Sequence, residues 1–206
     1  MKLADSFVQY EQDSAVERMM HEKAQQERYT MYVDWLENHH LAKNNLAAAL
    51  EMAQLIFQKR PWFSEYQKMH GLAMQHGNWE TVRQEALAFL ETTHNTSTLV
   101  EVALDEGNIE RALQLLEATR PHGLENYQWQ YDYARAPEGA LKTAERAEER
   151  YPRASIDLYQ QYVERLIAGR GRSNYQVACR YLAKMRSLYE KLDETGQWTT
   201  YIAWLR

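Results

Sequence analysis

The chain contains very little cysteine, proline and glycine: one Cys, 4 Pro and 8 Gly among 206 residues. A lone cysteine, Cys179, excludes a disulfide within the chain and any zinc site built from paired cysteines. We expect Cys179 to behave as a small buried hydrophobic side chain. Scarce helix breakers beside abundant Ala, Leu, Glu, Gln, Arg and Met favour helices throughout. The composition therefore predicts an all-α protein.

Long hydrophobic runs are also missing. No window approaches eighteen apolar residues, so we expect no membrane span and no membrane partner. Residues 1–27 are polar and charged, unlike a secretory signal. These features, with the single cysteine, favour a reducing, cytoplasmic location.

The motifs of the common catalytic and metal centres are absent. The sequence has no Gly-x-Ser-x-Gly elbow and no His-Glu-x-x-His, and the Gly169–Arg172 corner lacks the Walker lysine-serine ending. Glu17 and His21 are four residues apart on one predicted helix face, and we interpret this pair as surface decoration. We therefore expect no enzyme activity, no cofactor and no metal.

What the chain does contain is a seven-residue phrase in five versions. Each lies between two stretches with helical apolar periodicity. The clearest copy is Gly107–Leu113. The others are Asn44–Leu50, Gly77–Arg83, Arg135–Leu141 and Ser173–Cys179.

The phrase is typical of a tight corner between two helices. Gly or Asn at its start permits the left-handed backbone that ends a helix, and the asparagine that follows can cap the next helix. A bulky residue comes next and is expected in the core. A small residue three places later allows two helices to approach closely. The small-residue positions are Ala49, Val82, Ala112, Ala140 and Ala178.

The repeat spacing favours stacked helical hairpins. The small-residue positions are separated by 33, 30, 28 and 38 residues, close to the 34-residue tetratricopeptide period. The prolines at Arg60-Pro61 and Tyr151-Pro152 also resemble the proline that terminates a tetratricopeptide repeat. We expect a right-handed α-α superhelix, a tetratricopeptide-like solenoid of about five hairpins plus terminal helices. Residues 1–25 would form a polar N-terminal helix and residues 26–206 the repeat domain.

Individual helices are expected at defined ranges. They are 26–38 (with His39-His40 at its end), 45–59, 62–76, 79–92, 96–106, 109–119, 124–135, 138–150, 153–168, 175–192 and a last helix from 196. That last helix carries an apolar pattern of Trp198, Tyr201, Ile202, Trp204 and Leu205 up to the end of the sequence. The pattern suggests a shortened chain, a missing C-terminal cap or a homodimer contact.

The charge is unevenly distributed. The net charge is −5, yet residues 142–191 carry 11 basic and 6 acidic side chains and the remainder is strongly acidic. Basic residues interleaved with Tyr175 and Tyr181 fit binding of single-stranded nucleic acid. The alternative interpretation is a set of solvated helix faces.

The C-terminal third also resembles the helical tail of bacterial SWIM zinc-finger proteins. The matching stretches are Tyr151–Ala154, Tyr159–Leu166, Gly169–Tyr175, Ala178–Leu182, Leu188-Tyr189 and Trp198–Leu205. The Cys-x-Cys and Cys-x-His zinc motif of that family is absent here. The resemblance therefore implies a helical-repeat region that accompanies such a finger, and it transfers no functional residue.

These patterns together predict a non-catalytic scaffold for protein–protein interaction. A peptide or partner helix would bind along a concave face, with contacts from Tyr131, Tyr162, Arg165, Arg170 and Arg172. Binding of single-stranded nucleic acid through residues 142–191 is the alternative.

Overall fold

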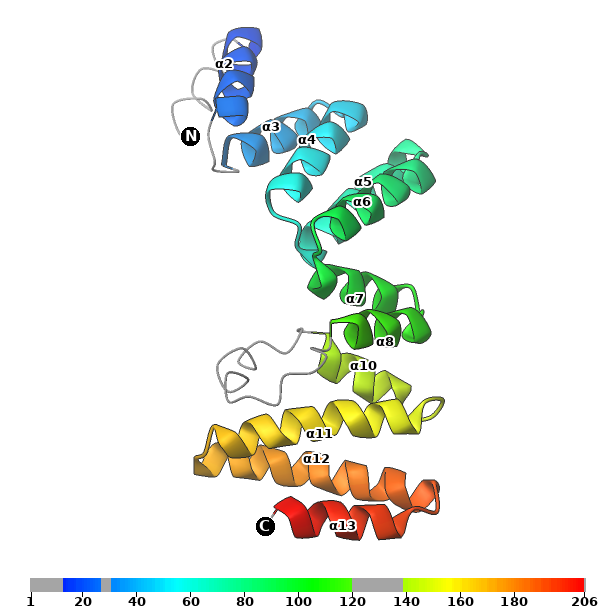
Figure 1. Cartoon of the computed structure of the whole chain (residues 1–206). Helices are drawn as coiled ribbons and strands as arrows, with labels where there is room; N and C mark the ends of the chain where they lie inside the picture. The colour runs from blue at the N-terminus through cyan, green and yellow to red at the C-terminus, as the bar shows by residue number, and fades with distance from the viewer. Residues whose placement is uncertain (1–12, 27–30, 120–138, 206) are drawn as a thin grey trace. The chain divides into compact units, whose positions relative to one another are not determined.

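The computed structural model describes residues 13–26, 31–119 and 139–205. The described residues form helices and no strand, which confirms the all-α prediction. The helices are α2 (Asp13–Gln26), α3 (Met31–Ala42), α4 (Leu46–Lys59), α5 (Phe63–His76), α6 (Trp79–Thr92), α7 (Thr96–Asp105), α8 (Ile109–Ala118), α10 (Ala140–Ala147), α11 (Pro152–Ala168), α12 (Arg172–Lys191) and α13 (Thr195–Leu205). Figure 1 shows their order along the chain. None of these described helices has the length and apolar character needed to cross a membrane.

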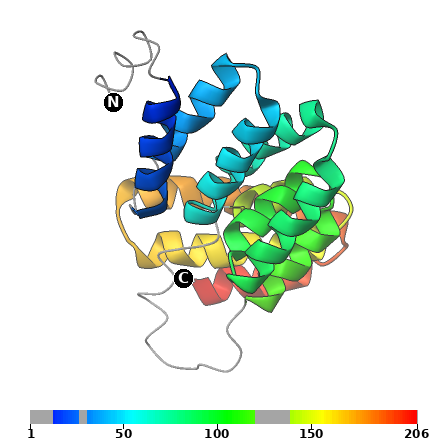
Figure 2. The ribbon, with the colours of Figure 1, turned by 90° about the horizontal axis from the view of Figure 1, so that it is seen from above.

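The chain divides into two compact units, Met1–Thr98 and Leu99–Arg206. In the first unit α2 packs on α3, α3 on α4, α4 on α5 and α5 on α6. Figure 2 shows the hairpin of α3 and α4 from above. Leu36 and Ile56 are fully buried where α3 meets α4. Full burial of such a side chain contributes about 1.5–3 kcal/mol.

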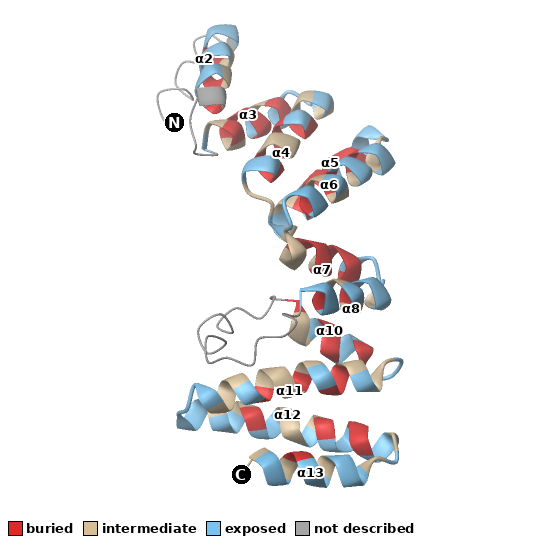
Figure 3. Cartoon of the chain, viewed as in Figure 1, coloured by how far each residue is buried: buried red, intermediate tan, exposed pale blue. Residues whose placement is uncertain are grey.

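The second unit is held together in the same way. α8 packs on α10, α10 on α11, α11 on α12 and α12 on α13. Its larger core cluster contains Tyr159, Val163 and Met185, all fully buried. Buried residues recur along the helices between exposed ones (Figure 3), as expected where each helix buries one stripe. Consecutive packing of helices is consistent with the predicted array of hairpins.

Three copies of the phrase lie between consecutive helices as predicted, and two of their three asparagines cap the next helix. The predicted cap by Asn78 was wrong, because its side chain makes no cap hydrogen bond to α6. The side chains of Asn45 and Asn108 accept from the amides of Ala48 and Arg111, at 3.2 and 3.0 Å, and so cap α4 and α8. Gly77 ends α5 in the left-handed region at φ 85°, a conformation that costs glycine little. The small side chains of Ala49, Val82 and Ala112 are buried, as the phrase predicts.

At the fourth corner, the absence of a side chain at Gly139 permits a close contact. A Cβ atom added there would lie 2.5 Å from Cγ1 of Val100, so the residue lets the chain approach α7 closely at the start of α10. The rest of that corner, and the helix predicted over 124–135, lie outside the described residues.

The fifth copy of the phrase does not form the predicted corner. α12 already begins at Arg172, because Gly171 makes the turn at φ 94°. Asn174 therefore lies within the first turn, and its side-chain amide donates to the carbonyl of Arg170 at 2.8 Å. Ala178 is buried as predicted. The predictions that Tyr175 and Cys179 are buried were wrong: Tyr175 is 46% exposed and Cys179 is exposed.

Helix α3 extends beyond its predicted end. α3 continues to Ala42, and His39 and His40 form part of its last turn. His40 is 4% exposed and belongs to the interior of the first unit. The turn comes at Asn44, which has a left-handed backbone at φ 55°. Burial of His40 therefore explains why the helix does not end where the polar pair suggested.

A buried charge joins α3 to α5. Glu37 is fully buried, and one of its oxygens accepts from Nζ of Lys68 at 2.5 Å. Its other oxygen, Oε1, has no hydrogen-bond partner among the described residues. Burial raises the pKa of Glu37 above its ordinary value of 4.5, and the contact with Lys68 offsets only part of that effect.

The capping asparagines provide a first test within the first unit. Asn45→Ala should lower the free energy of unfolding by about 1 kcal/mol, because α4 loses a side-chain cap. Asn78 precedes α6 without a side-chain cap bond, so Asn78→Ala is the matched control and should cost less than about 0.5 kcal/mol. Urea denaturation followed by circular dichroism measures both values. Equal losses in the two variants would contradict the capping role.

The raised pKa of Glu37 predicts a particular pH dependence. The folded state holds this proton more tightly than the unfolded chain, so the stabilisation is complete below pH 4.5 and is lost as pH rises through the folded pKa. Glu37→Gln mimics the protonated form and cannot titrate. The unfolding free energy of the native sequence, relative to this variant, should therefore fall as the pH rises above 4.5.

Urea denaturation at a series of pH values measures this difference. Lys68→Met removes the opposing attraction and should make the total fall larger, because the folded pKa of Glu37 rises further. A difference that rises with pH would show that the attraction to Lys68 outweighs burial.

Candidate functional site in the second unit

Two of the predicted contact residues lie together on α11. The guanidinium carbon of Arg165 lies 5.7 Å from the centroid of the Tyr162 ring. The Tyr162 ring in turn meets Tyr181 of α12 edge-on, at a centroid distance of 5.1 Å. These contacts form a small aromatic and basic surface across α11 and α12, with Tyr162 and Arg165 partly buried.

Two other predicted residues occupy the turn that joins α11 to α12. Arg170 has a left-handed backbone at φ 49°, and Arg172 is the first residue of α12. Both side chains are exposed. The remaining predicted contact, Tyr131, lies outside the described residues.

A charged network fixes the neighbouring part of α11 and α12. Nζ of Lys184 lies 3.2 Å from Glu145 and 3.1 Å from Glu148, and the hydroxyl of Tyr159 donates to Glu148 at 2.5 Å. Burial acts to raise the pKa of Glu148, but the hydrogen bonds from Tyr159 and Lys184 outweigh it and leave that pKa below its ordinary value. Burial and the bond to Glu148 raise the pKa of Tyr159. The network holds α10, α11 and α12 together and keeps Glu148 ionised.

Several basic side chains of residues 142–191 are paired with carboxylates. Arg186 lies 2.9 Å from Glu190, Lys142 lies 3.8 Å from Glu101, and Arg153 contacts Glu194. With Lys184, at least four of the 11 basic side chains in this stretch lie beside a carboxylate. The exposed bases at the turn between α11 and α12 are a separate group.

The second unit also has an open groove, which is lined mainly by aromatic side chains and side-chain amides. It has a volume of about 670 Å³. Its lining residues come from α11, α12 and α13. They are Gln160, Tyr189, Gly196, Gln197, Thr200, Tyr201 and Trp204. Most of this lining is apolar, and Trp204 is 68% exposed beside it.

Two tyrosine hydroxyl groups belong to the groove lining. The hydroxyl of Tyr201 is buried without a hydrogen-bond partner among the described residues. Burial is the main cause that raises the pKa of Tyr201, and the charge of Glu164 adds to it. Burial also raises the pKa of Tyr189, with Asp157 adding to it. The positive charge of Arg153 opposes part of this rise for Tyr189, but both pKa values stay above their ordinary value and the two tyrosines remain neutral phenols.

The sequence carries a local signal for only part of this groove. Tyr201 and Trp204 belong to the apolar pattern noted at the end of the chain. Gln160 and Tyr189 carry no local signal, because only the packing of α12 against both α11 and α13 brings them to the same place.

One further group could hold a metal ion. Glu17 and His21 of α2 and His40 of α3 each offer a ligand atom, and these three atoms lie within 4.8 Å of one another. The sequence showed the pair on α2, and the fold adds the third residue.

Comparison with known proteins gives no further assignment: no family model matches the chain, and no curated protein matches it significantly.

Proposed function

We propose that the chain is a non-catalytic module for protein–protein interaction, in which the groove along α11, α12 and α13 binds an amphipathic helix of a partner protein. The exposed indole of Trp204 beside an apolar groove is the observation that carries this proposal. Tryptophan and tyrosine dominate the energetics of protein interfaces because they bury a large rigid surface. We also infer that the hairpins follow the right-handed, tetratricopeptide-like arrangement that the repeat spacing favours.

The chemistry of the groove selects the kind of helix. Tyr189, Tyr201 and Trp204 provide an apolar surface for residues spaced three or four apart on the partner. Gln160, Gln197 and Thr200 offer amide and hydroxyl groups at its edges. Asp157 and Glu164 act on the groove tyrosines electrostatically. A basic amphipathic helix therefore complements the groove in shape and charge.

Selection from a displayed library of helical peptides tests the proposal with the full chain as bait. The selected peptides should be basic and amphipathic. Trp204→Ala should weaken their binding by about 30-fold, the loss expected for an interface hot spot. Trp62→Ala is the matched control, because Trp62 is similarly exposed at 60% but lies in the first unit.

Isothermal titration calorimetry measures the affinities, and light scattering gives the mass of the free chain. Failure to select such peptides, or equal losses in the two variants, would contradict the proposal. A dimer that dissociates in Trp204→Ala would instead assign the groove to a second copy of the chain.

The turn between α11 and α12 favours a second candidate function, the binding of single-stranded nucleic acid. Tyr175 is 46% exposed and lies on the first turn of α12, close in sequence to the exposed Arg170 and Arg172. An exposed aromatic ring beside basic side chains suits stacking on a nucleotide, with the basic side chains contacting its phosphates.

Fluorescence anisotropy with a labelled single-stranded oligonucleotide tests this second candidate. Tyr175→Ala should cost about 1–3 kcal/mol of binding free energy. Exchange of Arg170 and Arg172 for alanine should reduce the slope of log affinity against log salt by about 1.4, since two phosphate contacts are lost. Absence of binding at low salt would exclude this function.

A further inference from the structure

Three imidazoles and one carboxylate converge where α2 meets the end of α3. α2 buries a stripe of Val16, Met20 and Ala24, four residues apart, against the core of the first unit. Lys59 of α4 strengthens this docking by donating to the carbonyl of Ala24 at 3.0 Å. Because Glu17 and His21 each follow a member of the stripe, both lie at the edge of the contact with α3.

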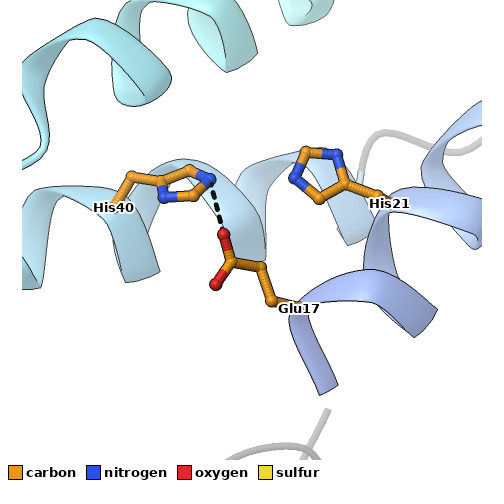
Figure 4. Close-up of side chains that lie close together, drawn as sticks. All are labelled: Glu17, His21 and His40. Atoms are coloured by element: carbon orange, nitrogen blue, oxygen red, sulfur yellow. Dashed lines mark ion pairs between the residues drawn. The ribbon is translucent and has the colours of Figure 1, made fainter. Parts of the chain in front are cut away.

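The last turn of α3 supplies the facing residues. Nε2 of His40 lies 3.7 Å from Oε1 of Glu17, and Nε2 of His39 lies 3.8 Å from Oε2 of the same carboxylate. The ring of His21 lies 6.0 Å from that of His40, between ring centroids. Figure 4 shows Glu17, His21 and His40 directed toward a common point between the two helices.

The orientation of His40 is not explained by hydrogen bonding. Its side chain is only 5% exposed, and Nε2 has no hydrogen-bond partner among the described residues. A buried polar atom normally has a partner, so an orphaned one calls for an explanation. A ligand that accepts the lone pair of a neutral imidazole would supply it.

We propose that Glu17, His21 and His40 bind a divalent transition-metal ion of the zinc class, with water completing a four-coordinate site. Two imidazoles and one carboxylate are a ligand set that zinc accepts with an open fourth position. The end of α3 also favours a cation, because the helix dipole is negative there.

The distances are compatible with closure onto an ion. The three candidate ligand atoms lie within 4.8 Å of one another, whereas ligands of a tetrahedral zinc ion are roughly 3.4 Å apart, given bonds of about 2.0–2.1 Å. The remaining gap is about 1.4 Å by the same geometry. Side-chain rotation of Glu17 and His21, which are both partly exposed, can close it without moving either helix.

Lys43 is the competitor of the ion in the present arrangement. Its ammonium nitrogen lies 3.7 Å from Oε2 of Glu17, and its side chain is 41% exposed. Because this long side chain can turn toward solvent, a metal ion can displace it. His39 lies almost as close to Glu17 as His40 does, and its Nε2 also has no hydrogen-bond partner among the described residues. Its ring differs in stacking on Trp35, at a centroid distance of 4.8 Å.

Titration of the full chain, without an affinity tag, with Co²⁺ tests the site. Cobalt reports its coordination through visible d–d absorption, and Zn²⁺ should displace it with a stoichiometry of one ion per chain. We expect the metal association constant to fall by more than about 100-fold in each of Glu17→Gln, His21→Ala and His40→Ala. Loss of a residue that only contacts a metal ligand typically costs about 10- to 100-fold. Lys43→Met should strengthen it, because the competing ammonium is gone.

His76→Ala is the matched control, because His76 is an exposed histidine of the same unit. Circular dichroism in the presence of a chelator separates loss of metal binding from loss of folding. His40 is buried, so Glu17→Gln and His21→Ala remain decisive if His40→Ala unfolds. Absence of a cobalt spectrum, equal losses in the control, or weaker binding by Lys43→Met would each overturn the proposal.

Discussion

The structure depends on the burial of one apolar stripe per helix against the next helix along the chain. α7 and α8 have only 10 residues each, and isolated helices shorter than about 12–15 residues are marginal in water. Neighbouring helices cover Leu36, Ile56 and Tyr159, and all three side chains are fully buried. Within each unit the helices are therefore stabilised by packing on their neighbours, which together supply the core.

This dependence also decides which polar groups come together. The stripe of Val16, Met20 and Ala24 must face α3, so the residues that follow it are brought to the same edge as His40. Likewise the packing of α12 against both α11 and α13 places Gln160, Tyr189 and Tyr201 around one groove. Polar and aromatic side chains at these junctions are constrained by the core although most of them are not part of it.

Local signals predicted much of the fold because their causes are local. Asn45 and Asn108 cap helices with bonds to amides three residues away, and Gly77 turns the chain through its own φ angle. The phrase failed at Ser173–Cys179 because Gly171 turned the chain earlier, so that α12 began at Arg172. Within α12 the side chain of Ala178 is buried, whereas Tyr175 and Cys179 are exposed. For the candidate sites, the sequence placed Tyr162 and Arg165 on one helix, but not their contact with Tyr181.

The amino-acid sequence by itself determined the all-α class, the positions of most helices and the corners that need glycine or asparagine, because these follow from periodicity and backbone preference. Tertiary structure decided which distant residues meet. Glu17 and His21 are one helical turn apart and visible as a pair, but His40 joins them only because α2 docks beside the end of α3. Such meetings depend on packing angles and on helix register, and a shift of one residue in a helix turns a side chain by roughly 100°.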